Sequence, residues 1–160
     1  MDGDLLVSPG PRGAHQAGVA ELFRLVDPYA RTHRIGRVCF SPADLDFRSG
    51  QLLQPDLFVG ARVGSRDPVE WTDYGIPLLV AEVLSPSTAH HDRVTKRRYY
   101  QRAGVPVYWI VDLDLRRVEV WCPGDRSPVS VEHVLPWRPD VGVPPLLIDL
   151  PRYFRAVWAE

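Results

Sequence analysis

Apolar residues near the start of the chain recur at helical spacing. Within residues 15–26 they fall three and four positions apart, at Val19, Leu22, Phe23 and Val26. This spacing is the pattern of one buried helix face. The dipeptide Asp27-Pro28 follows, and it is typical of a helix N-cap and first helical position. The pattern therefore predicts a helix over residues 15–26, then a second helical turn or a kink extending to about residue 32.

Shorter apolar runs, separated by Pro and Gly, predict strands along most of the remaining chain. We expect them over residues 4–8, 36–41, 45–47, 51–60, 77–84, 107–111, 117–121 and 129–135. A helix is expected over residues 89–103, ended by Gly104 and Pro106, and a short amphipathic helix after residues 144–150. Residues 62–75 indicate a loop. This order predicts one α/β or α+β domain over residues 1–160, with a mixed β-sheet flanked by helices.

The apolar run over residues 77–84 contains an acid, Glu82. A carboxylate in a buried strand is costly unless a cation holds it. Asp56 begins another apolar run, so both carboxylates would point into one pocket if the two strands pair. At 100° per residue, Lys96 shares a helix stripe with Asp92, Tyr99 and Ala103, which would face the sheet. We therefore expect Lys96 to reach the two carboxylates.

Two carboxylates and one amine suit metal-dependent hydrolysis of a phosphodiester, in which acids hold a divalent ion and a cation stabilises the transition state. Each residue also has a simpler interpretation. Asp56 follows a proline and is then a turn residue. Glu82 forms a structural ion pair, and Lys96 lies on the surface with its stem on apolar neighbours. Spacing and periodicity leave these alternatives open.

Composition narrows the functional classes. The net charge of −1 argues against a broadly basic nucleic-acid coat protein, but not against a nuclease with a local basic groove. Cys39 and Cys122 have no CxxC spacing, so neither a zinc site nor a disulfide scaffold is expected. No signal peptide and no apolar run of about 18 residues is visible, so we expect a cytoplasmic protein without a membrane span. Lys96 is the one lysine beside 18 arginines.

Five segments together resemble a known family. They are DGDLLVSPGPRGAHQ, PDLFVG, PLLVAEVLSPST, a D-x3-K pattern with two tyrosines soon after it, and GVPVYWIVDLDLRRVEVW. They resemble the Uma-two family of restriction-endonuclease-like proteins, which belongs to the PD-(D/E)xK nuclease superfamily. The resemblance extends over essentially the whole chain. It implies a restriction-endonuclease-like core, in which a mixed sheet is flanked by helices.

The resemblance also implies a site. Asp56 and Glu82 would bind Mg²⁺ or Mn²⁺, with the backbone carbonyl of Val83 as a third ligand. In the usual (D/E)xK tripeptide the lysine stands two places after the acid, where this chain has Leu84. In the resembling family the following helix supplies the lysine, which here is Lys96.

Four further residues are candidates. The resemblance implies an acid on the first helix, and Glu21 is the acid within residues 15–26; alternatively it is a solvated glutamate. His15 falls where the family has a histidine, and it either orients a ligand or phosphate or caps the helix. Arg93 and Arg97 would contact phosphates near the helix edge, or they are ordinary exposed arginines.

The leading hypothesis is a metal-dependent endonuclease acting on nucleic acid, with DNA as the expected substrate. One rival is a non-catalytic nucleic-acid-binding protein that retains the nuclease fold. Another is an assembly protein in which Glu82 and Lys96 form a buried ion pair. A homodimer is expected, with the apolar segment WIVDLDLRRVEVW over residues 109–121 as a candidate interface.

Overall fold

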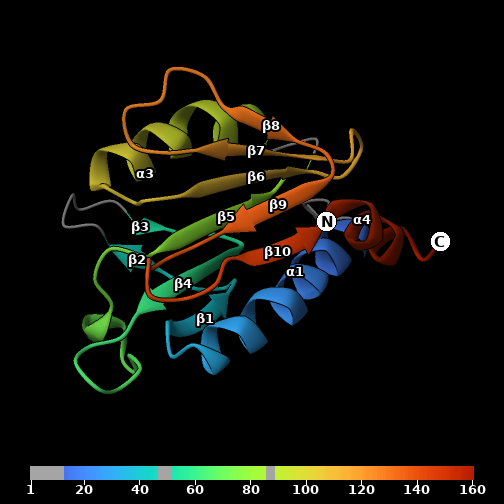
Figure 1. The fold of residues 1–160 in the computed structure, drawn as a ribbon. Coiled ribbons are helices and arrows are strands. Elements are labelled where there is room, and N and C mark those ends of the chain that lie inside the picture. Colours follow the sequence, from blue (N-terminus) through green and yellow to red (C-terminus); the bar gives the residue numbers. More distant parts are fainter. Residues whose placement is uncertain (1–12, 47–51, 86–88) are drawn as a thin grey trace, which may run out of the picture.

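The computed structural model describes residues 13–46, 52–85 and 89–160, and the strand expected over residues 4–8 lies outside these ranges. A six-stranded sheet runs through the fold in the order β1-β4-β5-β6-β7-β8 (Figure 1). Its strands are β1 (Gly36–Phe40), β4 (Leu57–Ala61), β5 (Leu79–Val83), β6 (Tyr108–Asp112), β7 (Arg117–Trp121) and β8 (Val129–Val131). β5 and β6 pair in parallel, whereas the other neighbours pair antiparallel.

Helices and two small sheets cover the main sheet. The helices are α1 (Gly13–Thr32), the continuous run of α2 (Ala89–His91), the π-helix η2 (Asp92–Lys96) and α3 (Arg97–Ala103), and α4 (Leu150–Trp158); η1 (Trp71–Asp73) is a 3-10 turn. The small sheets pair β2 (Leu45–Asp46) with β3 (Leu52–Leu53), and β9 (Val134–Trp137) with β10 (Leu146–Asp149). The predicted fold class, a mixed sheet flanked by helices, is confirmed.

Alternate residues of β5 enter two different cores, because successive strand side chains point to opposite faces. Leu79, Ala81 and Val83 pack in the core that contains α1, α4, β9 and β10. Val80 lies in the second core, which contains Tyr100 of α3 and the β2–β3 pair. Glu82 has the same parity as Val80, so its carboxylate points towards α3.

Helix α1 continues through Pro28 without a second N-terminus and ends at Thr32, so the predicted extent to about residue 32 is confirmed and the predicted N-cap at Asp27 is wrong. Asp27 does not cap a helix, since its carboxylate accepts a hydrogen bond from Arg31 Nε at 2.7 Å, one turn further on. Val26 and Ala30 are fully buried on either side of the proline. Their packing on the sheet favours a continuous helix despite the lost backbone hydrogen bond.

Three other sequence predictions need correction. The expected strand over residues 51–60 is divided into β3 and β4, because Pro55 cannot donate to a ladder. The expected strand over residues 129–135 is also divided, and β8 and β9 belong to different sheets. β10 precedes α4 as a strand that the amphipathic helix pattern did not reveal.

The candidate dimer segment over residues 109–121 lies inside the fold. Trp109, Ile110 and Val111 are completely buried in β6, and Trp121 is 7% exposed in β7. The turn residue Leu115 is exposed. The apolar character of this segment therefore reflects its place within the sheet, and the segment offers no apolar face to a second copy.

In the part of the chain that the structure describes, none of the helices combines the length and the apolar character needed to cross a bilayer.

Candidate functional site

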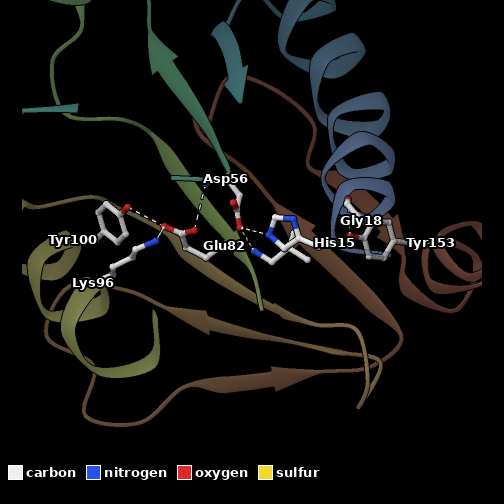
Figure 2. A network of polar contacts seen from close by, with 8 residues as sticks. His15, Gly18, Asp56, Glu82, Lys96, Tyr100 and Tyr153 are labelled. Atoms are coloured by element: carbon white, nitrogen blue, oxygen red, sulfur yellow. Dashed lines mark hydrogen bonds and ion pairs between the residues drawn. The ribbon is translucent and has the colours of Figure 1, made fainter. Parts of the chain in front are cut away.

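The carboxylates of Asp56 and Glu82 meet where β4 begins and β5 ends (Figure 2). The two strands are antiparallel neighbours, with Leu57 opposite Ala81. The backbone N–H of Asp56 donates to Glu82 Oε2 at 3.3 Å. The strand pairing that the sequence left conditional is therefore present, and it brings both acids to one end of the sheet.

Asp56 is held by one group from β5 and one from α1. Its Oδ2 accepts a hydrogen bond of 2.8 Å from the backbone N–H of Val83. The same oxygen lies 3.1 Å from Nε2 of His15, the third residue of α1. The side chains of His15 and Asp56 are 14% and 16% exposed, so this part of the cluster reaches solvent. Oδ1 of Asp56 has no protein partner among the described residues, which leaves it available to a ligand.

Glu82 is held by donors from the continuous run of η2 and α3. Its side chain is 1% exposed, and its Oε1 accepts a hydrogen bond from Lys96 Nζ at 3.0 Å. The hydroxyl of Tyr100 donates to the same oxygen at 3.1 Å. Figure 2 shows the two donors approaching Glu82 from one helix. The ammonium group compensates the charge of the buried carboxylate, which explains how an acid is tolerated within an apolar strand.

A close contact between α1 and the sheet places His15. A Cβ atom on Gly18 would lie 3.2 Å from a methyl group of Val83 and 3.3 Å from Leu113, so the missing side chain lets the helix approach β5. The buried hydroxyl of Tyr153 in α4 donates to the Gly18 carbonyl at 2.8 Å (Figure 2). His15 lies one turn before Gly18, and this approach directs it towards Asp56.

We expect Tyr153→Phe to change how stability depends on pH. Burial, assisted by the negative charge of Glu21, raises the pKa of Tyr153 far above its ordinary value. The neutral hydroxyl therefore stabilises the fold fully below pH 10, and this contribution is lost as the pH rises from 10 towards the folded-state pKa. Wild type should lose up to about 1.4 kcal/mol per pH unit through this group, and the variant should not. Urea unfolding between pH 8 and 11 measures the difference, and parallel profiles would contradict it.

Arg93 and Arg97 are engaged with β6 and β7 rather than with the acid pair. Arg93 donates to Asp112 at 2.9 Å and to Glu119 at 3.1 Å, two carboxylates that are 7% and 6% exposed. Burial lowers the pKa of Arg93, but the bond to Asp112 and the charge of Glu119 outweigh this and raise it. Arg97 lies over the ring of Trp121 at 4.3 Å and donates to the Arg93 carbonyl. The structure thus gives both arginines protein partners.

Glu21 lies apart from the cluster. It forms an ion pair with Arg24 on α1, and it lines a hollow between α1, β10 and α4 together with Leu147 and Arg152. It stands six positions after His15, which turns its side chain to another part of the helix surface. The structure therefore does not bring Glu21 to Asp56 and Glu82.

Asp56 and Glu82 are suited to a hard divalent cation by their chemistry. No group of three or more His, Cys, Asp or Glu residues within the described ranges could hold a metal ion. Further ligands would have to be backbone oxygen and water, which Mg²⁺ commonly retains. The N–H and C=O of a strand residue point to one side, so the Val83 carbonyl faces the side of β5 from which its N–H binds Asp56. The open Oδ1 of Asp56 and the nearby Oε2 of Glu82 fit such an ion.

Tyr100 was missed by the sequence analysis, which placed Tyr99 on the stripe of Lys96. Tyr100 is fully buried and Tyr99 is not. Tyr99 stands three positions after Lys96 and Tyr100 stands four, and either spacing places a residue on the same helix face as Lys96. The sequence pattern therefore could not distinguish the two tyrosines. The wide turn of η2, which the sequence analysis did not foresee, changes the orientation of the residues that follow it.

Comparison with known proteins agrees with this architecture. A family model described as "Uma2: Putative restriction endonuclease" matches residues 1–148. The crystal structure of a putative nuclease belonging to DUF820, from Anabaena variabilis, superimposes with a TM-score of 0.72 at 16% sequence identity. The match covers 98% of this chain and 89% of that chain. At this identity the likeness concerns the fold. No curated protein matches the sequence.

Proposed function

Because this chain belongs to the Uma2 family of restriction-endonuclease-like proteins, we propose that it is a metal-dependent endonuclease that hydrolyses phosphodiester bonds in DNA. One observation carries the proposal: two carboxylates and a lysine from three separate elements converge at one end of the sheet. Asp56 and Glu82 would hold Mg²⁺ or Mn²⁺, with the Val83 carbonyl as a third ligand. When bound, such an ion lowers the pKa of a coordinated water and neutralises nonbridging phosphate oxygens.

Side chains around the acid pair have separate roles in the proposed reaction. Lys96 donates from the helical side of the cluster, where its ammonium stabilises the charge that develops on the phosphate. His15 holds Oδ2 of Asp56 and so leaves Oδ1 as the oxygen that would bind the ion. The exposed fractions of His15 and Asp56 support entry of the DNA strand from this side. Arg93 contributes by fixing the helix that carries Lys96 and Tyr100.

Metal binding is the first test of this function. Mn²⁺ at 100 times its dissociation constant should raise the free energy of unfolding by about 2.7 kcal/mol, since the ion binds the folded site. Thermal melting with Mn²⁺ or EDTA measures the shift. Glu82→Gln and Asp56→Ala should abolish it. Asp27→Ala removes an acid of a surface ion pair on α1 and should leave it unchanged.

Cleavage is the second test. Wild type should nick supercoiled plasmid and cut single-stranded DNA in Mn²⁺, and EDTA should stop both reactions. Asp56→Ala and Lys96→Ala should be inactive, whereas Asp27→Ala should match wild type. Equal residual cleavage in all four proteins would identify a contaminant and remove the proposal. Binding of DNA without cleavage, measured by fluorescence anisotropy, would favour the non-catalytic alternative.

A further inference from the structure

Two donors of different chemistry share one oxygen of Glu82. Lys96 Nζ lies 3.0 Å from Oε1 and the hydroxyl of Tyr100 lies 3.1 Å from it. Oε2 is turned the other way and accepts the longer bond from the Asp56 backbone. A terminal carboxylate rotates easily, because the last torsion of a glutamate has a broad minimum. The donors on Oε1 therefore decide where Oε2 points.

The two donors differ in rigidity. The side chain of Lys96 is flexible and 16% exposed. Tyr100 is completely buried. The centroid of its ring lies 4.8 Å from that of the Tyr108 ring, with an interplanar angle of 51°. Residues of β2, β3 and β5 fill the same core around it. The packing thus holds the hydroxyl of Tyr100 in one position, whereas the ammonium of Lys96 can move.

The two donors also differ in charge. A divalent cation beside Glu82 would repel the ammonium of Lys96, since like charges at close range are unfavourable in a poorly solvated site. The hydroxyl of Tyr100 is neutral, so its hydrogen bond to Glu82 is compatible with an ion on Oε2. A neutral donor that binds a metal-binding carboxylate, without touching the ion, orients that carboxylate and strengthens its hold on the ion.

We propose that Tyr100 is a positioning residue that keeps Oε2 of Glu82 directed at Asp56 and thereby sets the affinity of the site for its divalent cation. This inference rests on the proposed function, because it assigns a role within the same site. Tyr100 touches neither substrate nor ion, and it acts through Glu82. Lys96 is then the donor that remains available to the phosphate.

The test compares Tyr100→Phe with wild type by isothermal titration with Mn²⁺ and by plasmid cleavage over a range of Mn²⁺ concentrations. Phenylalanine keeps the ring and removes the hydroxyl. We expect the dissociation constant for Mn²⁺ to rise about tenfold or more, the lower end of the range when a hydrogen-bond partner of a metal ligand is lost. The cleavage rate should recover to near the wild-type value at saturating Mn²⁺. Lys96→Ala should stay inactive at every Mn²⁺ concentration.

Tyr29→Phe is the matched control. Its hydroxyl donates to the Pro144 carbonyl at 2.6 Å, away from the acid pair, so its loss should leave Mn²⁺ affinity and cleavage unchanged. A lower melting temperature for Tyr100→Phe with an unaltered dissociation constant would assign Tyr100 a merely structural role and overturn the inference. The wild-type protein decides the underlying function separately: without Mn²⁺ binding or cleavage in wild type, the proposed function itself fails.

Discussion

Lys96→Met is expected to lower the free energy of unfolding by about 3 kcal/mol in metal-free buffer. The substitution keeps an unbranched apolar side chain but removes the cation beside Glu82, which is 1% exposed. Breaking a buried ion pair from one side costs about 3–5 kcal/mol, since an uncompensated charge is left behind. The hydroxyl of Tyr100 and the backbone N–H of Asp56 still donate to Glu82, which favours the lower end of that range.

The same variant should respond more strongly to metal. Without the ammonium, Mn²⁺ meets less repulsion at Glu82 and replaces the missing positive charge. The rise in melting temperature caused by Mn²⁺ should therefore exceed that of wild type, even though cleavage falls by about 10²–10³-fold through loss of a transition-state donor. Differential scanning calorimetry with Mn²⁺ or EDTA, together with a plasmid assay, measures both effects.

Two further variants control for charge and for the pair itself. Arg98→Met removes an exposed cation from the same helix, and its effect should stay within about 0.5 kcal/mol. Adding Glu82→Gln to Lys96→Met removes the stranded carboxylate and should recover part of the lost stability, while the response to Mn²⁺ disappears. A Lys96→Met protein as stable as wild type would show that the ion pair does not hold Glu82 in the strand.

The convergence of Asp56, Glu82 and Lys96 was predictable because each depends on a local pattern. Glu82 stands out as an acid in an apolar run, and Asp56 stands at the start of a second run. Antiparallel pairing of β4 and β5 then brings them together. The direction of Lys96 follows from a helix that packs on the sheet, which holds whether the preceding turn is α or π.

The rest of the site depends on contacts that no local pattern reveals. The bond from Tyr153 to Gly18 joins residues 135 positions apart, and it fixes the helix that presents His15. Arg93 carries the same charge as the exposed Arg98 on the same helix, and its role comes from two carboxylates on β6 and β7. Glu21 was expected at the acid pair, but α1 turns it towards α4 and β10. Its position within the helix sequence gave no indication of this direction. Such assignments require the packing of the helices on the sheet.

Arg93→Met is expected to lower the free energy of unfolding by about 3 kcal/mol or more, and to weaken Mn²⁺ binding as well. Arg93 lies within the π-helix and donates to the nearly buried carboxylates of Asp112 and Glu119. Its removal leaves Asp112 without its cationic partner, whereas Glu119 keeps the longer ion pair with Arg117 at 3.7 Å, so most of the loss comes from Asp112. Arg93→Lys should rescue only part of the loss, because an ammonium lacks the planar fork that spans two carboxylates.

Arg97→Met is the matched control for this prediction, since Arg97 lies one turn further along the same helix. It loses a cation–π contact with Trp121, for which about 1 kcal/mol is expected. Urea unfolding compares the three variants, and Mn²⁺ titration reports on the site. If Arg93 fixes the helical run that presents Tyr100 to Glu82, the Mn²⁺ affinity must fall with Arg93→Met and stay at the wild-type value with Arg97→Met. Equal losses of Mn²⁺ affinity in Arg93→Met and Arg97→Met would contradict this prediction. They would mean that the helix is held by its contacts with β7 in general, and not by the bridge from Arg93 to two buried acids.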